Sequence, residues 1–333
     1  MRLIEARAAE RFVVSSKLRI GVAGAGVFGA HHASKYAASD DAILVGVLDR
    51  HPDRAEALAN RFGARVFDDE GALLDGVDAL VIATPAVTHY DFARAALEAG
   101  RHVFVEKPVA LTPEDADELI ALADARSLIL QVGHQERYVA AEVGLFERRD
   151  APLKIDCVRC AAPSGRCEDV SVVFDLMVHD LDLVRHLTKS ELETLDASGD
   201  AHEAFAEMSL ANGAVASFKA SRRAAHLERR MTLVYEDGFI EIDFIKRDIV
   251  NSTPAPLRSD LNGEKAPLAF ADPLGFGANQ FVAAVLSGET PVVSGRDGRD
   301  AVAWARRIED AASISAGNVN GAHQADARER LLA

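Results

Sequence analysis

The chain has 333 residues, of which 49% are apolar and 27% charged, and its formal net charge is −15. This length is sufficient for two globular domains, each with a substantial core. The excess of acidic residues argues against nucleic acid as a partner, because phosphate binding requires a basic surface.

The first 16 residues form an extension before the first predicted strand. They contain two glutamates and no continuous apolar stretch, which is unlike a secretory signal. No segment of the chain approaches the roughly 20 apolar residues of a membrane span. The three cysteines, Cys157, Cys160 and Cys167, do not resemble a disulfide framework. We therefore expect a cytoplasmic protein that has no membrane partner.

Residues 17–134 alternate between strand and helix patterns. The predicted strands are 19–23, 43–48, 79–83, 102–105 and 128–132, and the predicted helices are 28–36, 52–62, 89–99 and 113–125. Most of these strands are continuous apolar runs, as in a parallel sheet that is covered on both faces. The pattern predicts an α/β fold, with a doubly wound parallel sheet of the Rossmann type.

Residues 135–316 follow a different rhythm and form the second predicted domain. Turn signals such as Asn212-Gly213 and Glu236-Asp237-Gly238 join neighbouring strand patterns, which indicates antiparallel hairpins. The predicted strands are 153–161, 192–198, 205–210, 214–220, 231–235 and 239–244, and the predicted helices are 138–147, 175–186, 273–286 and 299–316. This order predicts an α+β domain with a mostly antiparallel open sheet, followed by a polar tail at 317–333.

The pair Cys157 and Cys160 has the spacing of a zinc or redox motif, but it falls within a predicted strand. Residues three apart on a strand point to opposite faces and cannot chelate one ion. We therefore predict that they are buried thiols.

A glycine pattern follows the first predicted strand and precedes the first predicted helix. Gly24 permits a tight turn, Gly26 lets the backbone approach a pyrophosphate, and Gly29 lets helix and strand pack closely. Val27 and Phe28 lie at the start of the helix, whose free N–H groups favour an anion. A glycine-rich turn without a ligand, or the first loop of a methyltransferase, has a similar pattern.

An acidic residue ends the next predicted strand. Asp49 stands 20 positions after Gly29, where an acid accepts hydrogen bonds from a ribose 2′-hydroxyl and repels a 2′-phosphate. This position favours NAD as the cofactor. Because Arg50 lies beside it and an arginine can accept the phosphate, NADP remains possible.

Polar residues gather after three later strands of the predicted sheet. Thr84 to His89 follow one strand, Glu106-Lys107-Pro108 follow the next, and His134 follows the last. The carboxyl ends of the strands are where open α/β sheets bind ligands. We therefore expect these residues beside the cofactor, although His89 could instead cap its helix.

The predicted helix at 175–186 carries an acid and a histidine four positions apart. Asp175 and His179 share a face at this spacing, and a histidine can move a proton at neutral pH. Asp175 could orient the histidine, bind a sugar hydroxyl, or both. Together with Asp182 they could instead bind a metal, but no second histidine-rich segment supplies further ligands.

Taken together, these motifs resemble those of the glucose–fructose oxidoreductase / inositol dehydrogenase (Gfo/Idh/MocA) family over nearly the whole chain. The matching pieces are Gly24 to Gly29, Thr84 to His89, Glu106-Lys107-Pro108, Asp175 with His179, and the segment 297–302. Within the family, the segments 133–137 and 179–182 resemble those of sugar-nucleotide 3-dehydrogenases. The resemblance implies an NAD(P)-dependent dehydrogenase that acts on a hydroxyl or ketone of a sugar, polyol or sugar derivative.

The resemblance also implies roles for individual residues. Lys107 matches the active-site lysine, whose ammonium polarises the reacting oxygen; Pro108 matches a proline that often follows a cis bond. His179 matches the acid–base residue, and Asp175 matches its partner. The implied cofactor contacts are Gly24, Gly26, Val27, Phe28, Gly29, Asp49, Arg50, Thr84, Pro85, His89, Glu106, Lys107 and His134.

The implied substrate contacts are Lys107, Asp175 and His179. Arg166 and Asp169 lie in the loop before the predicted helix at 175–186 and are weaker candidates for substrate contact, because a solvated loop is the plainer interpretation. His31-His32 and Trp304 are expected to be packing or surface residues. The resemblance further implies a homodimer or homotetramer that forms through the exposed face of the C-terminal sheet.

Two other functions are compatible with these motifs. Some relatives use NAD transiently to hydrolyse glycosidic bonds, and such an enzyme would form product without net NADH. A sensor of sugars or dinucleotides would bind its ligand without turnover, although the intact lysine, aspartate and histidine argue against it.

Overall fold

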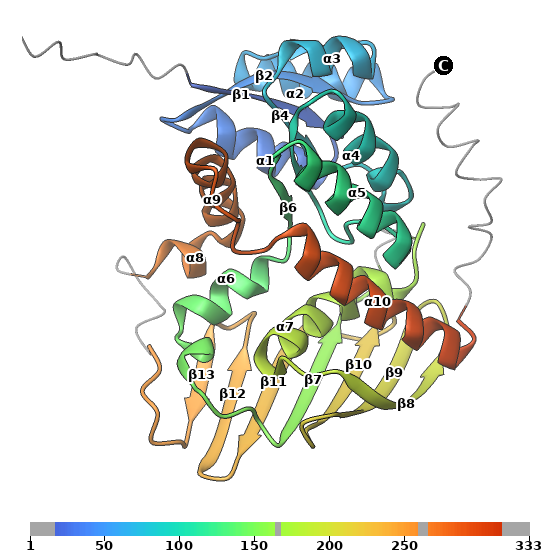
Figure 1. The fold of residues 1–333 in the computed structure, drawn as a ribbon, viewed down its shortest axis with the longest axis vertical. Helices are drawn as coiled ribbons and strands as arrows, with labels where there is room; N and C mark the ends of the chain where they lie inside the picture. Colours follow the sequence, from blue (N-terminus) through green and yellow to red (C-terminus); the bar gives the residue numbers. More distant parts are fainter. Residues whose placement is uncertain (1–16, 164–167, 259–265, 315–333) are drawn as a thin grey trace, which may run out of the picture.

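The structure, a computed structural model, describes residues 17–163, 168–258 and 266–314. Two sheets lie at opposite ends of the molecule, with helices between and around them (Figure 1). In the part of the chain that is described, no helix is both long and apolar enough to cross a membrane.

The first sheet has six parallel strands in the order β3-β2-β1-β4-β5-β6. The strands are β1 (Leu18–Ala23), β2 (Ala42–Leu48), β3 (Arg65–Val66), β4 (Ala79–Ile82), β5 (His102–Val105) and β6 (Leu130–Val132). The order reverses between β1 and β4, which is the switch point where doubly wound sheets bind ligands. The predicted Rossmann-type sheet is confirmed.

Helices cover both faces of this sheet. One face carries α1 (Val27–Ala37), α2 (Pro52–Phe62) and α9 (Pro273–Ser287), and the other carries α3 (Glu70–Gly76), α4 (His89–Glu98) and α5 (Pro113–Ala125). The short 3-10 helix η1 (Ala86–Thr88) precedes α4. Phe281 of α9 meets Phe104 of β5 edge to face, with ring centroids 5.7 Å apart. A helix from the predicted second domain therefore packs on the sheet of the first.

The second sheet has seven strands in the order β13-β12-β11-β7-β10-β9-β8. They are β7 (Lys154–Cys160), β8 (Leu192–Gly199), β9 (Glu203–Leu210), β10 (Val215–Ser221), β11 (Glu228–Tyr235), β12 (Gly238–Asp243) and β13 (Asp248–Asn251). Among the described strands of this second sheet, only the pair β7 and β10 is parallel. The predicted hairpins at Asn212-Gly213 and Glu236-Asp237-Gly238 are confirmed as β9–β10 and β11–β12.

Both described cysteines lie on β7, where they are buried and free, as predicted. Cys167 lies outside the described residues.

The remaining helices connect the two sheets. They are α6 (Gln135–Glu142), the 3-10 helix η2 (Leu145–Glu147), the π-helix η3 (Val173–Met177), α7 (Val178–Thr188), α8 (Leu268–Ala271) and α10 (Gly295–Ala312). The predicted helix at 138–147 is interrupted, because Gly144 adopts a φ of 84°. Helix α10 begins four residues before the predicted start, because Ser294 and Asp297 form a capping box there.

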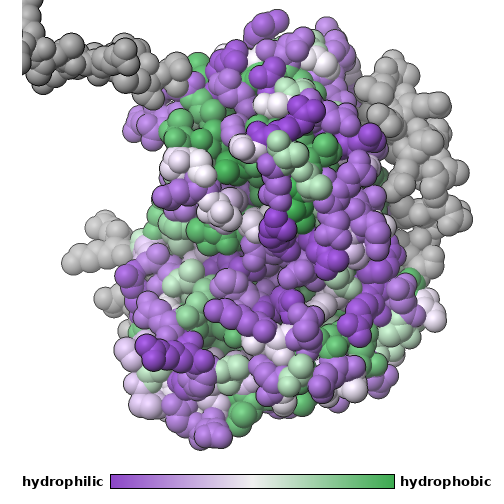
Figure 2. Space-filling model, viewed as in Figure 1, coloured by the Kyte–Doolittle hydropathy of each residue, from purple (hydrophilic) through white to green (hydrophobic). Residues whose placement is uncertain are grey.

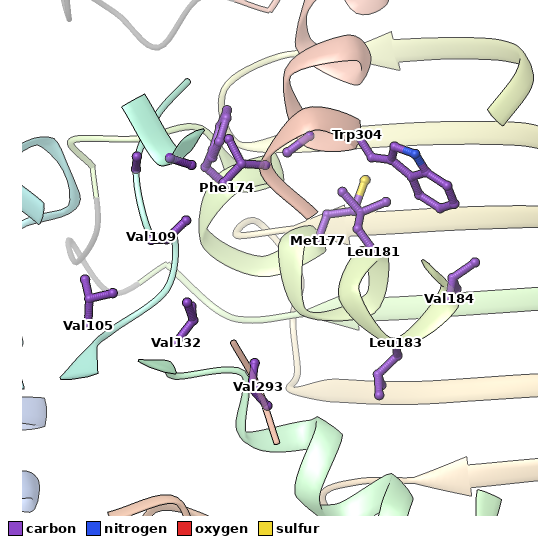
Figure 3. Close-up of a cluster of buried hydrophobic side chains, with 14 of the residues drawn as sticks. Val105, Val109, Val132, Phe174, Met177, Leu181, Leu183, Val184, Val293 and Trp304 are labelled. Carbon is purple, nitrogen blue, oxygen red and sulfur yellow. The ribbon is translucent and has the colours of Figure 1, made fainter. Parts of the chain in front are cut away.

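A single hydrophobic core extends from the first sheet to the second. Figure 3 shows part of this core, with Val105 and Val132 of the first sheet on one side and Met177 and Leu181 on the other. Trp304 of α10 is buried in the same core, which agrees with its predicted packing role. The face of the molecule shown in Figure 2 is mostly hydrophilic, as expected for a strongly charged chain. The shared core holds the strand ends of the first sheet close to η3 and α7.

Candidate active site

The glycine turn after β1 leaves room for a ligand at one position and none at another. A Cβ on Gly29 would lie 1.8 Å from the carbonyl oxygen of Gly24, whose own φ is 98°. A Cβ on Gly26 would meet no protein atom within 4 Å. Helix α1 then begins without a side-chain cap, so its first N–H groups can bind phosphate. This turn fits a dinucleotide pyrophosphate.

A cleft of about 670 Å³ opens at the switch point of the first sheet. Most of the predicted cofactor contacts line it: Gly24, Gly26, Val27, Phe28, Asp49, Arg50, Thr84, Pro85, His89, Glu106 and Lys107. Asp169 and Asp175 also line it, whereas Gly29, His134 and His179 do not. Arg166 lies outside the described residues. The cleft therefore joins the glycine turn to the lysine loop.

Asp49 is held rigidly at the end of β2. Its Oδ2 accepts a hydrogen bond from the Ala25 N–H at 2.6 Å, and its Oδ1 accepts one from the His51 N–H at 2.8 Å. The carboxylate keeps further lone pairs that can accept a bond from a ribose hydroxyl. Its negative charge disfavours a 2′-phosphate, but Arg50 and Arg54 line the same part of the cleft.

His89 connects the two loops that follow β4 and β5. Its Nδ1 lies 2.7 Å from the Pro108 carbonyl oxygen, and its Nε2 lies 3.0 Å from the Thr84 carbonyl oxygen. Burial lowers the pKa of His89, although the two carbonyl groups oppose this change. The peptide bond between Lys107 and Pro108 is cis. His89 thus joins the loops that carry Thr84 and Lys107.

Glu106 forms a buried pair with His32 of α1. The Oε1 atom of Glu106 lies 2.7 Å from Nε2 of His32, whose ring meets Phe104 edge to face at 4.8 Å. Burial would raise the pKa of Glu106, but His32 lowers it below its usual range. His32 is a packing residue, as predicted, and it also fixes the residue before Lys107. His31, in contrast, is exposed.

Lys107 and Asp175 meet where the lysine loop reaches the second domain. The Lys107 ammonium donates to Oδ1 of Asp175 at 3.0 Å and to its carbonyl oxygen at 2.6 Å. Arg222, which follows β10, donates to the other oxygen of Asp175 at 3.1 Å. Burial would raise the pKa of Asp175, but these two cations lower it. The aspartate is therefore ionised and held between two positive groups.

His179 lies one helical turn after Asp175 but contacts a different acid. Its Nδ1 is 2.7 Å from Oε2 of Glu136 on α6. The ring of His134 meets it edge to face, with centroids 5.9 Å apart. Burial lowers the pKa of His179 to about 3, and the Glu136 carboxylate only partly opposes this change. The histidine is therefore neutral at pH 7, with one ring nitrogen whose lone pair can accept a hydrogen bond.

Sequence reasoning missed the groups that support this histidine. Glu136 and Arg159 are buried, and Arg159 donates to Glu136 at 2.7 Å and to Asp180 at 2.8 Å. The segment 133–137 attracted notice as a motif, but nothing in its spacing indicates that Glu136 reaches His179. Arg222 and Arg229 lie 43 and 50 residues after His179, so no local sequence pattern could reveal them.

The aspartates of the 175–182 segment have separate cationic partners. Asp182 forms a buried ion pair with Arg137, whereas Asp175 is bound by Lys107 and Arg222. Within the described ranges no three His, Cys, Asp or Glu side chains are grouped as metal ligands. His134 is fully buried, and burial lowers its pKa, so it adds a neutral ring to the site.

Comparisons with known proteins agree on one family. Residues 18–134 match the model described as "Oxidoreductase family, NAD-binding Rossmann fold", and residues 163–241 match the "GFO/IDH/MocA C-terminal domain". The UDP-N-acetylglucosamine 3-dehydrogenase of Acidithiobacillus ferrooxidans is 35% identical over 302 residues, which cover 87% of this chain and 96% of that protein. The myo-inositol 2-dehydrogenase of Thermotoga maritima is 26% identical and covers 91% of this chain and 100% of its own length.

Comparison with solved structures supports the same family. The structure of the Acidithiobacillus enzyme superposes with a TM-score of 0.81 at 34% identity, covering 89% of this chain and 98% of that one. A probable dehydrogenase from Thermotoga maritima superposes with a TM-score of 0.76 at 25% identity, covering 89% and 97%. Two domain models of one family match the chain, and a relative at 35% identity covers 87% of it. The chain therefore belongs to the Gfo/Idh/MocA family of NAD-binding oxidoreductases.

Proposed function

We propose that this dehydrogenase oxidises a secondary hydroxyl of a sugar nucleotide, with Lys107, Asp175 and His179 at the reacting centre. One observation carries the proposal: Lys107, beside the cofactor cleft, binds an ionised aspartate, and the same helical segment carries a neutral histidine on which the Lys107 charge acts. A neutral histidine can accept a hydroxyl proton, and an ammonium can stabilise negative charge on oxygen.

His179, Lys107 and Asp175 have separate roles in the proposed reaction. Nε2 of His179 takes the proton of the hydroxyl, while Lys107 stabilises the oxygen as it becomes a carbonyl. Asp175 holds the Lys107 ammonium in place and can accept a hydrogen bond from a neighbouring hydroxyl. Bound NAD supplies the hydride acceptor. Reduction follows the same path in reverse.

The substrate class rests on the relatives. The Acidithiobacillus protein is named for the 3-hydroxyl of UDP-N-acetylglucosamine, and the Thermotoga protein for myo-inositol. We assign this chain to the first kind, because it is 35% identical to the UDP-sugar enzyme over 302 residues and 26% identical to the inositol enzyme over 348 residues. The predicted preference for NAD over NADP is part of the proposal and rests on Asp49.

Absorbance at 340 nm tests the proposal directly. We expect NADH to form with NAD and UDP-N-acetylglucosamine, and more slowly or not at all with myo-inositol. Lys107→Ala and His179→Ala should each lower kcat by about 10²–10⁴, whereas Lys154→Ala on the second sheet should match the wild type. Full activity in both site variants would refute the assigned roles, and product without net NADH would favour transient oxidation.

We also propose that the outer face of the second sheet mediates self-association. Phe205 and Phe239 are 40% and 41% exposed on this face, beside charged residues such as Lys219 and Glu241. Exposed aromatic groups within a polar surround are typical of interfaces. Light scattering should give a dimer or tetramer for the wild type and a monomer for Phe205→Glu with Phe239→Glu. An unchanged mass would refute this interface.

A further inference from the structure

Glu136 and His179 come from different helices and meet beside the lysine loop. Glu136 lies in the first turn of α6, and His179 lies in the first turn of α7. The carboxylate is only 8% exposed, and its Oε2 is 2.7 Å from Nδ1 of the histidine. None of the sequence motifs, nor the family resemblance, assigned a role to this glutamate.

The second oxygen of Glu136 is fixed by a buried guanidinium. Arg159 of β7 donates to Oε1 at 2.7 Å, and it also forms two hydrogen bonds with Asp180, at 3.0 and 2.8 Å. Asp180 directly follows His179, so one arginine holds both the carboxylate and the helix that carries the imidazole. Arg229 approaches the same Glu136 oxygen at 3.8 Å. The carboxylate therefore has little freedom to turn away from the ring.

A carboxylate at Nδ1 decides which nitrogen of the ring carries the proton. An ionised carboxylate can only accept a hydrogen bond, so Nδ1 must be the protonated nitrogen and Nε2 must have the free lone pair. Burial would raise the pKa of Glu136, but His179 and Arg159 hold it well below its usual range, so the acid is ionised. Nδ1 is the ring nitrogen that faces the carboxylate, at 2.7 Å from its Oε2, and among the described residues no ion pair is found at Nε2.

We propose that Glu136 is a positioning residue, which holds His179 in the tautomer whose Nε2 lone pair is available to the substrate hydroxyl. This inference rests on the proposed role of His179 as the base. Without the carboxylate, half or more of the imidazole would carry its proton on the nitrogen that must accept one. In serine hydrolases, an amide in place of the orienting carboxylate lowers kcat by about 10⁴ for this reason.

Several charged groups surround the imidazole, and they set the direction of a pH effect. Beside Glu136, the charged groups that interact with it are Glu106 and Lys107 from the loop after β5, Arg159 from β7 and Asp175 from η3. The neutral ring of His134 meets it edge to face. Lys107 and Arg159 lower the pKa of His179, and Glu136 raises it. Removing the negative charge of Glu136 must therefore move the protonation of His179 to lower pH.

Nitrogen NMR of the cofactor-free protein tests the tautomer without any assumption about the substrate. With ¹⁵N-labelled histidine, and His179→Ala to assign the signal, the wild type should show a protonated Nδ1 and an unprotonated Nε2 at pH 7. In Glu136→Gln the amide can donate to Nδ1, so the pattern should reverse. Glu142→Gln, at the exposed end of the same helix, should leave it unchanged. A protonated Nε2 in the wild type would overturn the proposal.

Kinetics then separate positioning from packing. Glu136→Gln should lower kcat by about 10²–10⁴ with KM within a few-fold, and it should move the acidic limb of the pH profile to lower pH. Glu136→Asp restores the charge at a shorter reach and should recover part of kcat. A raised KM at unchanged kcat, or an unmoved acidic limb, would overturn the positioning role. Inactivity of the wild type on every sugar would refute the proposed function, while the NMR result would still decide the tautomer.

Discussion

The two ends of the active site are built in different ways. At the cofactor end, the backbone forms most of the site, through the glycine turn after β1 and the N-terminus of α1, which has no side-chain cap. At the substrate end, side chains from α6, β7, η3 and α7 meet in a buried set of ion pairs. One end depends on a short local motif, and the other depends on residues that are far apart in sequence.

We therefore expect the two ends of the active site to be sensitive to different kinds of substitution. A backbone site fails when a side chain intrudes, because an added Cβ either collides with the chain or occupies the space of the ligand. A side-chain site fails when one charge is removed, because its buried partners lose their compensation. Three sets of substitutions, each with a matched comparison, test whether the two ends behave in these two ways.

The largest effect is expected at the substrate end, from Arg159→Met. Arg159 is 2% exposed and is hydrogen-bonded to two buried acids, Glu136 and Asp180. Removing the guanidinium leaves these acids without compensation, so the free energy of unfolding should fall by about 3–5 kcal/mol. The midpoint of urea denaturation measures the change.

An exposed pair supplies the control for this substitution. Arg19 binds Asp78 in a similar bidentate manner, but the two side chains are 47% and 36% exposed. Arg19→Met should therefore change the stability by less than about 1 kcal/mol. If Arg159→Met is equally mild, the buried charges do not hold the substrate end together.

A pair of glycine substitutions tests the cofactor end. Gly29→Ala places a methyl group 1.8 Å from the Gly24 carbonyl oxygen, so the turn must shift and the stability should fall by about 1–3 kcal/mol. Gly26→Ala meets no protein atom, so the protein should remain stable while NAD binding weakens. Thermal unfolding and NAD titration separate the two effects. Equal losses of stability would contradict a ligand-facing role for Gly26.

The same contrast explains what the sequence could predict. The strand 102–105 and the helices 52–62 and 113–125 were predicted with the bounds that the structure has, because apolar runs, capping residues and glycines are local signals. The glycine turn and Asp49 were recognised for the same reason. The predictions missed β3, α3, β13 and α8, which are only two to seven residues long and have too few residues for a periodic pattern.

The substrate end could be predicted only in part. The helical spacing of Asp175 and His179 suggested that the aspartate orients the histidine, binds a sugar hydroxyl, or both. The helical segment passes from a π-helix to an α-helix between them, and each residue forms its own ion pair. Glu136 lies 43 residues before His179, and only the tertiary structure brings the two together. A buried ion pair across such a distance leaves no periodic signal in a single sequence.

The smallest effect is expected from Asp49→Asn, which tests how far a side chain contributes to the cofactor end. The amide keeps an oxygen for one of the backbone N–H groups that Asp49 binds, so the loop should hold its shape. It removes the negative charge that disfavours a 2′-phosphate, and Arg50 can then attract that group. The ratio of kcat/KM for NAD over NADP should fall about tenfold, which corresponds to about 1.4 kcal/mol.

Asp53→Asn is the control for this substitution. It removes the same charge from the first turn of α2, four residues after Asp49, and should leave the ratio unchanged. If both variants keep the wild-type ratio, cofactor choice lies in the backbone turn alone, and the cofactor end differs from the substrate end even more than we propose.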